Sequence, residues 1–171
     1  PEIVISLVEE YALDAIQLHG DESEVYIAEL NEQLAERRTL FLEENTKIKK
    51  KKNRHVISDN PIEIIKVFGI KDAFNFENLQ PYLEFIDYFL FDTKGKERGG
   101  NGVQFDWSIL AQYPFKKPFF LSGGIGLENL KEVQKIMNSN LPIYAVDINS
   151  KVEIKPGVKN IEEVKIFKNT L

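Results

Sequence analysis

The chain has 171 residues with a net charge of −5, of which 43% are hydrophobic and 29% charged, and it contains no cysteine. This length and balance predict one globular domain, and the negative charge argues against a general binder of nucleic acid or anionic membranes. The lack of cysteine excludes disulfides, thiolate metal ligands and a cysteine nucleophile within these residues. No apolar run approaches the roughly 20 residues of a membrane helix and no secretory leader is recognisable, so we expect a cytoplasmic protein.

Hydrophobic periodicity predicts an alternation of helices and strands. The chain opens inside an amphipathic helix pattern over residues 1–11, without an initiator methionine. Short, nearly continuous apolar runs, typical of strands covered on both faces, follow at 15–18, 62–68, 88–91, 118–121 and 143–148. Helical patterns occupy 21–52, 75–86, 105–112, 126–138 and 160–169. This βαβα order predicts a parallel sheet within a single domain, 1–171.

Each predicted strand ends in polar residues or glycine. The ends are Gln17 to Gly20, Phe68-Gly69, Asp92-Thr93, Ser122 to Gly124 and Asp147 to Ser150. Five such ends facing one way favour the rim of a barrel. An open doubly wound sheet is the alternative, although it usually concentrates glycine at one crossover.

The segment 31–60 is predicted to be a charged insertion within the domain. It contains a lysine-rich run from Lys47 to His55. Such a run could contact nucleic acid, but no aromatic residue interleaves the lysines to stack on bases. We favour a solvated helix end, where cations complement the helix dipole, and we expect neither a nucleic-acid nor a membrane partner.

Asp92 is the first candidate for chemistry. It ends the predicted strand 88–91 and precedes a loop that contains Gly99, Gly100 and Gly102. Glycines there would allow the loop to fold over a substrate and exclude water, although a plain flexible turn has the same composition. The alternative role for Asp92 is to cap the following turn through its side-chain oxygen, together with Thr93.

Four segments in order resemble phosphoribosylanthranilate isomerase, the (β/α)8-barrel enzyme of tryptophan biosynthesis. They are Asp14 to Gly20 (DAIQLHG), Asp92 to Trp107, Leu121 to Ile125 (LSGGI), and Val146 to Ser150 (VDINS) continuing through Glu153 to Asn160. The resemblance implies an α/β fold of TIM-barrel type. It also implies an incomplete barrel here, with about five parallel strands (family strands 4–8) and their helices, and with the first strands missing.

The resemblance implies an isomerase. The family reaction is an Amadori rearrangement of N-(5-phosphoribosyl)anthranilate to 1-(2-carboxyphenylamino)-1-deoxyribulose 5-phosphate, which needs a general acid, a base and a grip on phosphate. Asp92 matches the general acid. The family's base is a cysteine at the end of the first strand, so the absence of cysteine predicts that this chain alone is inactive. No metal and no cofactor are expected.

The resemblance also assigns residues to substrate and phosphate. Substrate binding is assigned to His19, Gly99, Gly100 and Asp147, and phosphate binding to Gly123, Gly124, Asn149 and Ser150. Simpler roles are open for each group. His19 would donate to a backbone carbonyl, Asp147 would cap the next turn, and the glycine pair would form only a tight strand-to-helix turn. If the loop binds phosphate instead, the unhindered N–H groups from Gly123 to Gly126 would face the anion at a helix N-terminus.

Two other functions compete with the isomerase. A half barrel that binds a phosphorylated sugar without catalysis is favoured by the missing cysteine. Indole-glycerol-phosphate synthase or ribulose-phosphate epimerase would need a lysine or metal-binding histidines at the strand ends, and neither pattern is seen. Because an incomplete barrel exposes strand edges, we expect a homodimer or an association with the missing N-terminal segment.

Overall fold

The computed structural model describes residues 1–47, 61–71, 73–93 and 105–171. These residues fall into two compact units, Pro1–Lys66 with Pro81–Asp87, and Val67–Gln80 with Tyr88–Leu171. Gly99 and Gly100 lie outside the described residues, as does the second half of the predicted insertion, 48–60. The predictions that fall on them, including the single domain 1–171, stay predictions.

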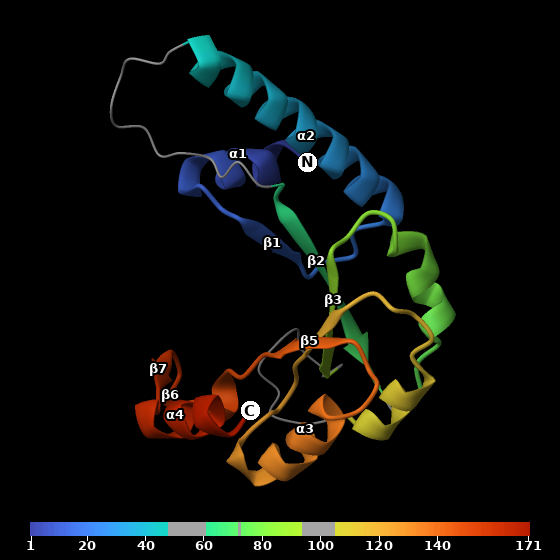
Figure 1. Ribbon diagram of the computed structural model, residues 1–171, viewed down its shortest axis with the longest axis vertical. Coiled ribbons are helices and arrows are strands. Elements are labelled where there is room, and N and C mark those ends of the chain that lie inside the picture. The colour runs from blue at the N-terminus through green and yellow to red at the C-terminus, as the bar shows by residue number, and fades with distance from the viewer. Residues whose placement is uncertain (48–60, 72, 94–104) are drawn as a thin grey trace. The chain divides into compact units, whose positions relative to one another are not determined.

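The first unit packs two helices against a strand pair. Helix α1 (Glu2–Tyr11) and helix α2 (Glu24–Lys47) contact each other, and β1 (Ala15–Leu18) pairs in parallel with the first half of β2 (Glu63–Ile70) (Figure 1). Its core consists of apolar side chains that are all buried: Ile5, Val8, Ile16, Leu18, Ile27, Leu30 and Ile64. The predicted amphipathic helix at the start of the chain and the strand at 15–18 are thus confirmed.

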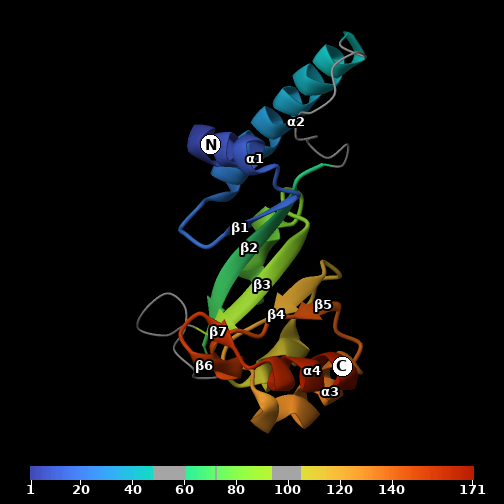
Figure 2. The ribbon, with the colours of Figure 1, turned by 90° about the vertical axis from the view of Figure 1, so that its left-hand side faces the viewer.

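The second unit carries the remaining strands. β3 (Tyr88–Thr93), β4 (Phe119–Leu121) and β5 (Ile143–Val146) pair in parallel, with Phe89 opposite Phe119 and Phe119 opposite Ile143. Over the described residues the sheet runs in the order β1-β2-β3-β4-β5, which confirms the predicted parallel sheet (Figure 2).

Helices α3 (Leu130–Met137) and α4 (Ile161–Thr170) follow β4 and β5. An antiparallel hairpin of β6 (Glu153–Lys155) and β7 (Val158–Lys159), which the sequence pattern did not predict, precedes α4.

Several predicted boundaries are wrong, each for a local reason. The patterns at 75–86 and 105–112 form the 3-10 helices η1 (Phe76–Tyr82) and η2 (Trp107–Gln112). Pro81 lacks the N–H that an α-helix needs, and Pro114 disfavours helical backbone at Tyr113. β2 runs through Gly69 to the fully buried Ile70, so Gly69 does not end the strand.

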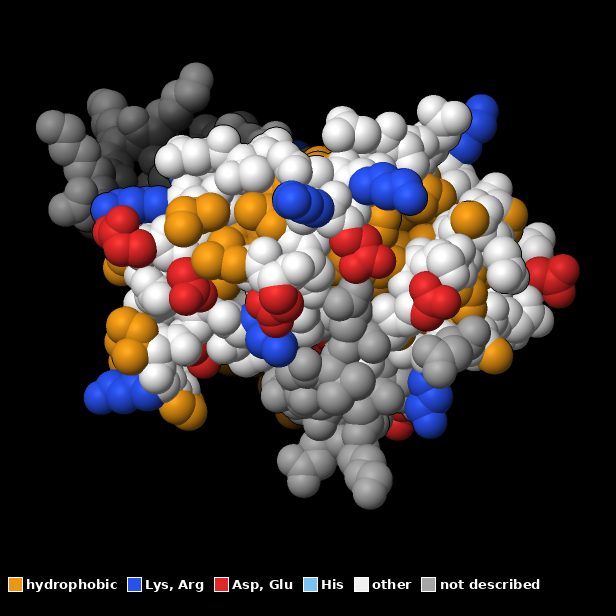
Figure 3. Space-filling view, turned by 90° about the horizontal axis from the view of Figure 1, so that it is seen from below, with side chains coloured by type: hydrophobic (Ala, Val, Ile, Leu, Met, Phe, Trp, Pro, Cys, Tyr) orange, Lys and Arg blue, Asp and Glu red, His pale blue; other side chains and the backbone are white. Residues whose placement is uncertain are grey.

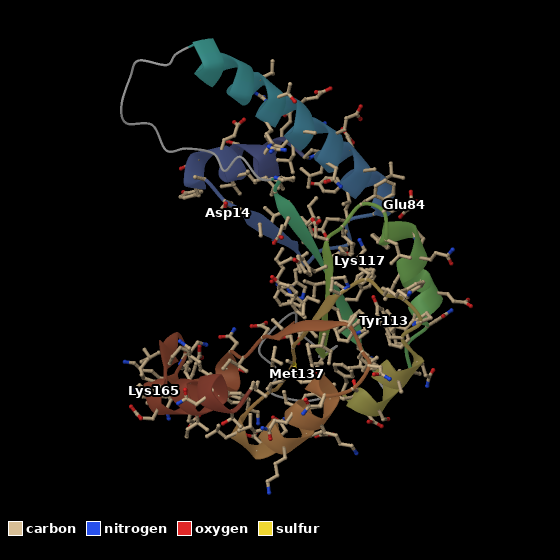
Figure 4. All side chains as sticks on the ribbon, in the orientation of Figure 1. Asp14, Glu84, Tyr113, Lys117, Met137 and Lys165 are labelled. Atoms are coloured by element: carbon tan, nitrogen blue, oxygen red, sulfur yellow. The ribbon has the colours of Figure 1, made fainter. Side chains whose placement is uncertain are left out.

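Aromatic side chains form the core of the second unit. The Tyr113 ring lies edge-on to Phe91 and Phe119 at centroid distances of 5.5 and 5.2 Å, and it also contacts Phe76 and Phe89. Its hydroxyl donates to the backbone oxygen of Lys117 at 2.7 Å; both residues are labelled in Figure 4. Burial raises the pKa of Tyr113 above the ordinary value of a tyrosine.

The surface mixes charges of both signs. On the face drawn in Figure 3, Lys and Arg side chains are interspersed with Asp and Glu and with apolar side chains. Among the helices of the described ranges, none combines the length and apolar character needed to cross a membrane.

Candidate active site

The alternation of β3 decides which way Asp92 faces. Phe89 and Phe91 are fully buried on the face of the aromatic core, and their rings stack at 5.9 Å. Tyr88 and Asp92 therefore share the opposite face. There the Tyr88 ring contacts Phe120 of β4 and Tyr144 of β5, at centroid distances of 5.4 and 4.4 Å. Asp92, the penultimate residue of β3, thus lies on the face that carries this second group of aromatic rings.

The Asp92 carboxylate is half-buried and hydrogen-bonded to its own turn. Its Oδ1 accepts the backbone N–H of Thr93 at 2.7 Å, and Thr93 Oγ1 accepts the N–H of Phe105 at 3.3 Å. The turn-capping contact expected as the alternative role is present. It fixes the direction of the carboxylate, and it leaves the catalytic role a prediction.

Gly123 brings the end of β4 against the end of β3. Its φ of +94° lies in the left-handed region that favours glycine. A Cβ at this position would lie 2.7 Å from the Thr93 backbone nitrogen and 3.0 Å from Asp92 Oδ1. The close approach of the two strand ends thus needs a residue without a side chain.

Ser122 joins the ends of β4 and β5. It is buried, its N–H donates to Phe91 O at 2.9 Å, and its hydroxyl donates to Asp147 Oδ2 at 3.0 Å. The Asp147 N–H donates to Leu121 O at 2.8 Å, which continues the ladder past β5. The sequence pattern alone assigned Ser122 no role, although its position directly after β4 was a usable signal. We call Asp92, Thr93, Ser122, Gly123 and Asp147 the strand-end cluster.

The loop after β4 turns into α3 through a short 3-10 helix, η3 (Leu127–Asn129), and not directly. Gly124 has a φ of +66°. The Gly126 N–H donates to Asn129 Oδ1 at 2.9 Å, and Asn129 Nδ2 donates to Gly124 O at 3.4 Å. One N–H that was expected to face an anion is therefore occupied by Asn129.

The loop after β5 lies beside the start of η3. Lys151 Nζ pairs with Glu128 Oε1 at 3.0 Å, between side chains that are 36% and 59% exposed. Asn149 is exposed, and its side-chain and backbone oxygens both accept from Lys159 Nζ. Ser150 is exposed at the start of η4 (Ser150–Val152). The two predicted phosphate loops are thus neighbours, although Asn149 is engaged by a lysine.

His19 belongs to the first unit. It is exposed and directly follows β1. Close to it lies a buried lysine, Lys66, which is paired with Glu22 at 2.8 Å. The sequence pattern singled out neither Lys66 nor Glu22, because a single lysine within an apolar strand pattern gives no sign of burial.

Parallel strands with α-helices or 3-10 helices in the connections, and with glycine, serine and carboxylates at the strand ends, define an α/β protein with the features expected of the TIM-barrel class. A family model described as N-(5'phosphoribosyl)anthranilate (PRA) isomerase matches residues 1–62 and 48–170. The chain belongs to the N-(5'-phosphoribosyl)anthranilate isomerase family, as the resemblance predicted.

Individual relatives agree with this assignment. The chain is 37% identical over 158 residues to the N-(5'-phosphoribosyl)anthranilate isomerase of Parabacteroides distasonis, covering 92% of this chain and 58% of that protein. It is 43% identical over 112 residues to the isomerase of Petrotoga mobilis, covering 65% of this chain and 52% of that protein. The chain thus spans little more than half the length of these two curated relatives.

A solved structure supports the fold. The phosphoribosyl anthranilate isomerase from Thermus thermophilus superposes with a TM-score of 0.66 at 24% sequence identity, covering 99% of this chain and 66% of that one. This likeness confirms the predicted α/β fold of TIM-barrel type.

Proposed function

We propose that the protein containing this chain is an isomerase of tryptophan biosynthesis that converts N-(5-phosphoribosyl)anthranilate to 1-(2-carboxyphenylamino)-1-deoxyribulose 5-phosphate. Membership of the family supports the reaction class. The observation that carries the proposal to this chain is the strand-end cluster, in which the Asp92 carboxylate lies against Gly123 beside the hydrogen-bonded pair of Ser122 and Asp147.

Asp92 is the proposed general acid. Its protonated carboxyl would give a proton to the ring oxygen of the ribose while the bond from C1 to that oxygen breaks, leaving an iminium at C1. The hydrogen bond from Thr93 holds the carboxylate in one direction, so its position is set before substrate arrives.

A base then removes the proton from C2. The resulting enolamine takes up a proton at C1 and becomes the 2-ketone, so substrate and product are isomers and no electrons are exchanged with a cofactor. The resemblance assigns the base to a cysteine, and none of the 171 residues is a cysteine. The proposal therefore concerns the acid and the binding groups of this chain, in the context of the whole protein.

The phosphate would bind between the loops after β4 and β5. Gly123 and Gly124 support this, because within the described ranges no hydrogen bond ties their N–H groups to another described residue. Asn149 and Ser150 would contribute from the other loop. Lys159 would then either move away from Asn149 or stay bonded to it while Asn149 also contacts the phosphate. This is the usual position of phosphate in barrels of this class.

The remaining predicted contacts belong to the rest of the substrate. Asp147, His19, Gly99 and Gly100 are proposed to contact the sugar or the anthranilate ring. We expect the reaction to take place in the cytoplasm, with a small phosphorylated molecule as the partner.

The test is turnover of N-(5-phosphoribosyl)anthranilate labelled with ¹³C at C2, followed by NMR with the full-length protein in D2O. The proposal predicts a new ketone resonance from C2 and one deuterium at C1 of the product, because the C2 proton is lost to solvent exchange at the base. A mass measurement of unlabelled material would not suffice, since the two compounds are isomers. No ketone signal at any protein concentration would overturn the proposal.

A second function is favoured by one observation, the lack of cysteine in the chain. Under this alternative the protein binds phosphorylated sugars without converting them. The same experiment separates the two, because a pure binder would shift the ³¹P resonance of the substrate and leave the C2 resonance in place.

A further inference from the structure

Lys66 is a charged residue in the interior of the first unit. Its side chain is 3% exposed, although it lies in the middle of β2. A buried ammonium is costly unless charged and polar partners surround it. Its Nζ donates to Glu22 Oε2 at 2.8 Å and to Gly20 O at 2.8 Å. The lysine is thus bonded to the turn that follows β1, more than 40 residues earlier in the chain.

Glu22 completes a ring of hydrogen bonds around Gly20. Its two carboxylate oxygens accept the Gly20 N–H at 3.1 and 2.9 Å. The N–H of Gly20 is therefore held by Glu22 while its carbonyl is held by Lys66. We call these three residues the Gly20 clamp. A Cβ on Gly20 would lie 3.0 Å from the Glu22 carboxyl carbon, so a larger residue there would require the Glu22 carboxylate to shift.

The Glu22 carboxyl is charged near neutral pH. Burial by itself would raise the pKa of Glu22, but the hydrogen bond from Lys66 and those from backbone N–H groups outweigh it, so the pKa lies below the ordinary value of a glutamate. The hydrogen bond between Lys66 and Glu22 is therefore charge-assisted through the Glu22 carboxylate.

The strand register tells where the clamp acts. Leu18 lies opposite Lys66 in the parallel pair, and both side chains are buried. Successive side chains of a strand point to opposite faces, so His19 faces away from Leu18, and it is exposed. The clamp therefore holds the peptide next to His19 from the buried face and leaves the imidazole on the other face.

We infer that Lys66 and Glu22 are positioning residues, which hold the backbone at Gly20 so that His19 presents its imidazole to the substrate from the end of β1. The inference rests on the proposed function for its use of His19, whereas the clamp itself stands on the hydrogen bonds and the burial. Neither residue touches the substrate in this account.

The clamp is tested without activity by amide hydrogen exchange in the full-length protein. Lys66→Met and Glu22→Gln should each speed exchange of the Gly20 N–H about tenfold or more and shift the ring signals of His19. Lys165→Met is the matched control, because it removes an exposed ion pair with Glu162 on α4. It should change neither signal. Urea unfolding identifies a variant that does not fold, and Glu22→Gln, which keeps the side-chain size, then decides the test.

The positioning role is tested by a double-mutant cycle in turnover. Lys66→Met should lower kcat/KM by about tenfold to a hundredfold, as expected when a binding group is displaced by about 1 Å. In a His19→Ala background the same change should cost almost nothing, because its effect passes through His19. A purely structural lysine would cost the same factor in both backgrounds, and that result would overturn the inference.

The two proposals fail in different ways. If the wild-type protein gives no turnover, the proposed function fails. The clamp is then still tested by the amide hydrogen exchange rate of Gly20 and by the ring signals of His19. Unchanged Gly20 exchange and an unchanged His19 ring in both folded variants would overturn the inference even if turnover is normal in the wild type.

Discussion

Gly123 and the backbone of Thr93 approach so closely that a Cβ on Gly123 would lie 2.7 Å from the Thr93 nitrogen. That nitrogen carries the N–H bonded to the Asp92 carboxylate. A side chain at 123 would therefore have to push away the group that orients the proposed acid. Through this contact the glycine after β4 would influence the proposed chemistry at the end of β3, whether or not its own N–H binds phosphate.

Gly123→Ala should damage both stability and turnover. The positive φ alone costs about 1–2 kcal/mol for a residue with a Cβ, and relief of the overlap with Thr93 should add about 1–3 kcal/mol. Gly157→Ala is the matched control, because Gly157 also has a positive φ, +79°, but a Cβ there would meet no atom within 4 Å. In urea unfolding, the free energy of unfolding of Gly123→Ala should be well below that of Gly157→Ala. Equal losses of stability in the two variants would mean that Thr93 moves away from the added Cβ at almost no cost.

Ser122→Ala should weaken substrate binding more than folding. The hydroxyl that holds Asp147 would be lost, at a cost of about 1 kcal/mol in stability. With Asp147 free to rotate, KM should rise several-fold in steady-state kinetics. Ser139→Ala serves as the control, since Ser139 Oγ donates to Ile136 O at an exposed site. If Ser122→Ala has the same KM as Ser139→Ala, then the orientation of Asp147 by Ser122 does not contribute to substrate binding.

Tyr113→Phe should change the alkaline limit of stability. Below pH 10 the variant should lose about 1 kcal/mol through the missing bond to Lys117. Because the folded-state pKa of Tyr113 is raised above 10.0, the unfolded chain releases this proton first, and wild-type stability should fall as the pH rises past 10. The variant lacks this contribution, so the free energies of unfolding of the wild type and of Tyr113→Phe, plotted against pH, should converge between pH 10 and 11. Parallel curves there would contradict the burial of the hydroxyl.

Features set by local sequence were predictable. The strand at 15–18 has the same bounds in the structure, since its apolar run is short and flanked by Asp14 and His19. Asp92 and Asp147 were found at strand ends because a carboxylate directly after an apolar run is visible in the sequence. The 3-10 helices were not predicted, because apolar spacing alone does not distinguish them from α-helices. Pro81 within one pattern and Pro114 after the other are the local signals that it does not include.

Features set by contacts between distant segments were not predictable. The bond between Ser122 and Asp147 joins residues 25 apart, and the pairing of Lys66 with Glu22 joins residues 44 apart. A lysine in a strand pattern is normally a solvated side chain. Only the fold shows that the turn at Gly20 supplies a carbonyl and a carboxylate to it. The β6 and β7 hairpin was missed because its strands are too short to give an alternating pattern.

The most direct test of the account is the turnover rate of Asp92→Asn in the full-length protein, measured with the C2-labelled substrate. Asparagine keeps the size of the side chain and its acceptor oxygen for Thr93 but cannot act as an acid, so kcat should fall by about 10²-fold to 10⁴-fold. Asp106→Asn is the matched control, because asparagine can still cap η2 through the N–H of Ser108. Its rate should match that of the wild type. A rate for Asp92→Asn close to that of the control would contradict the account, because the proton would then come from another group.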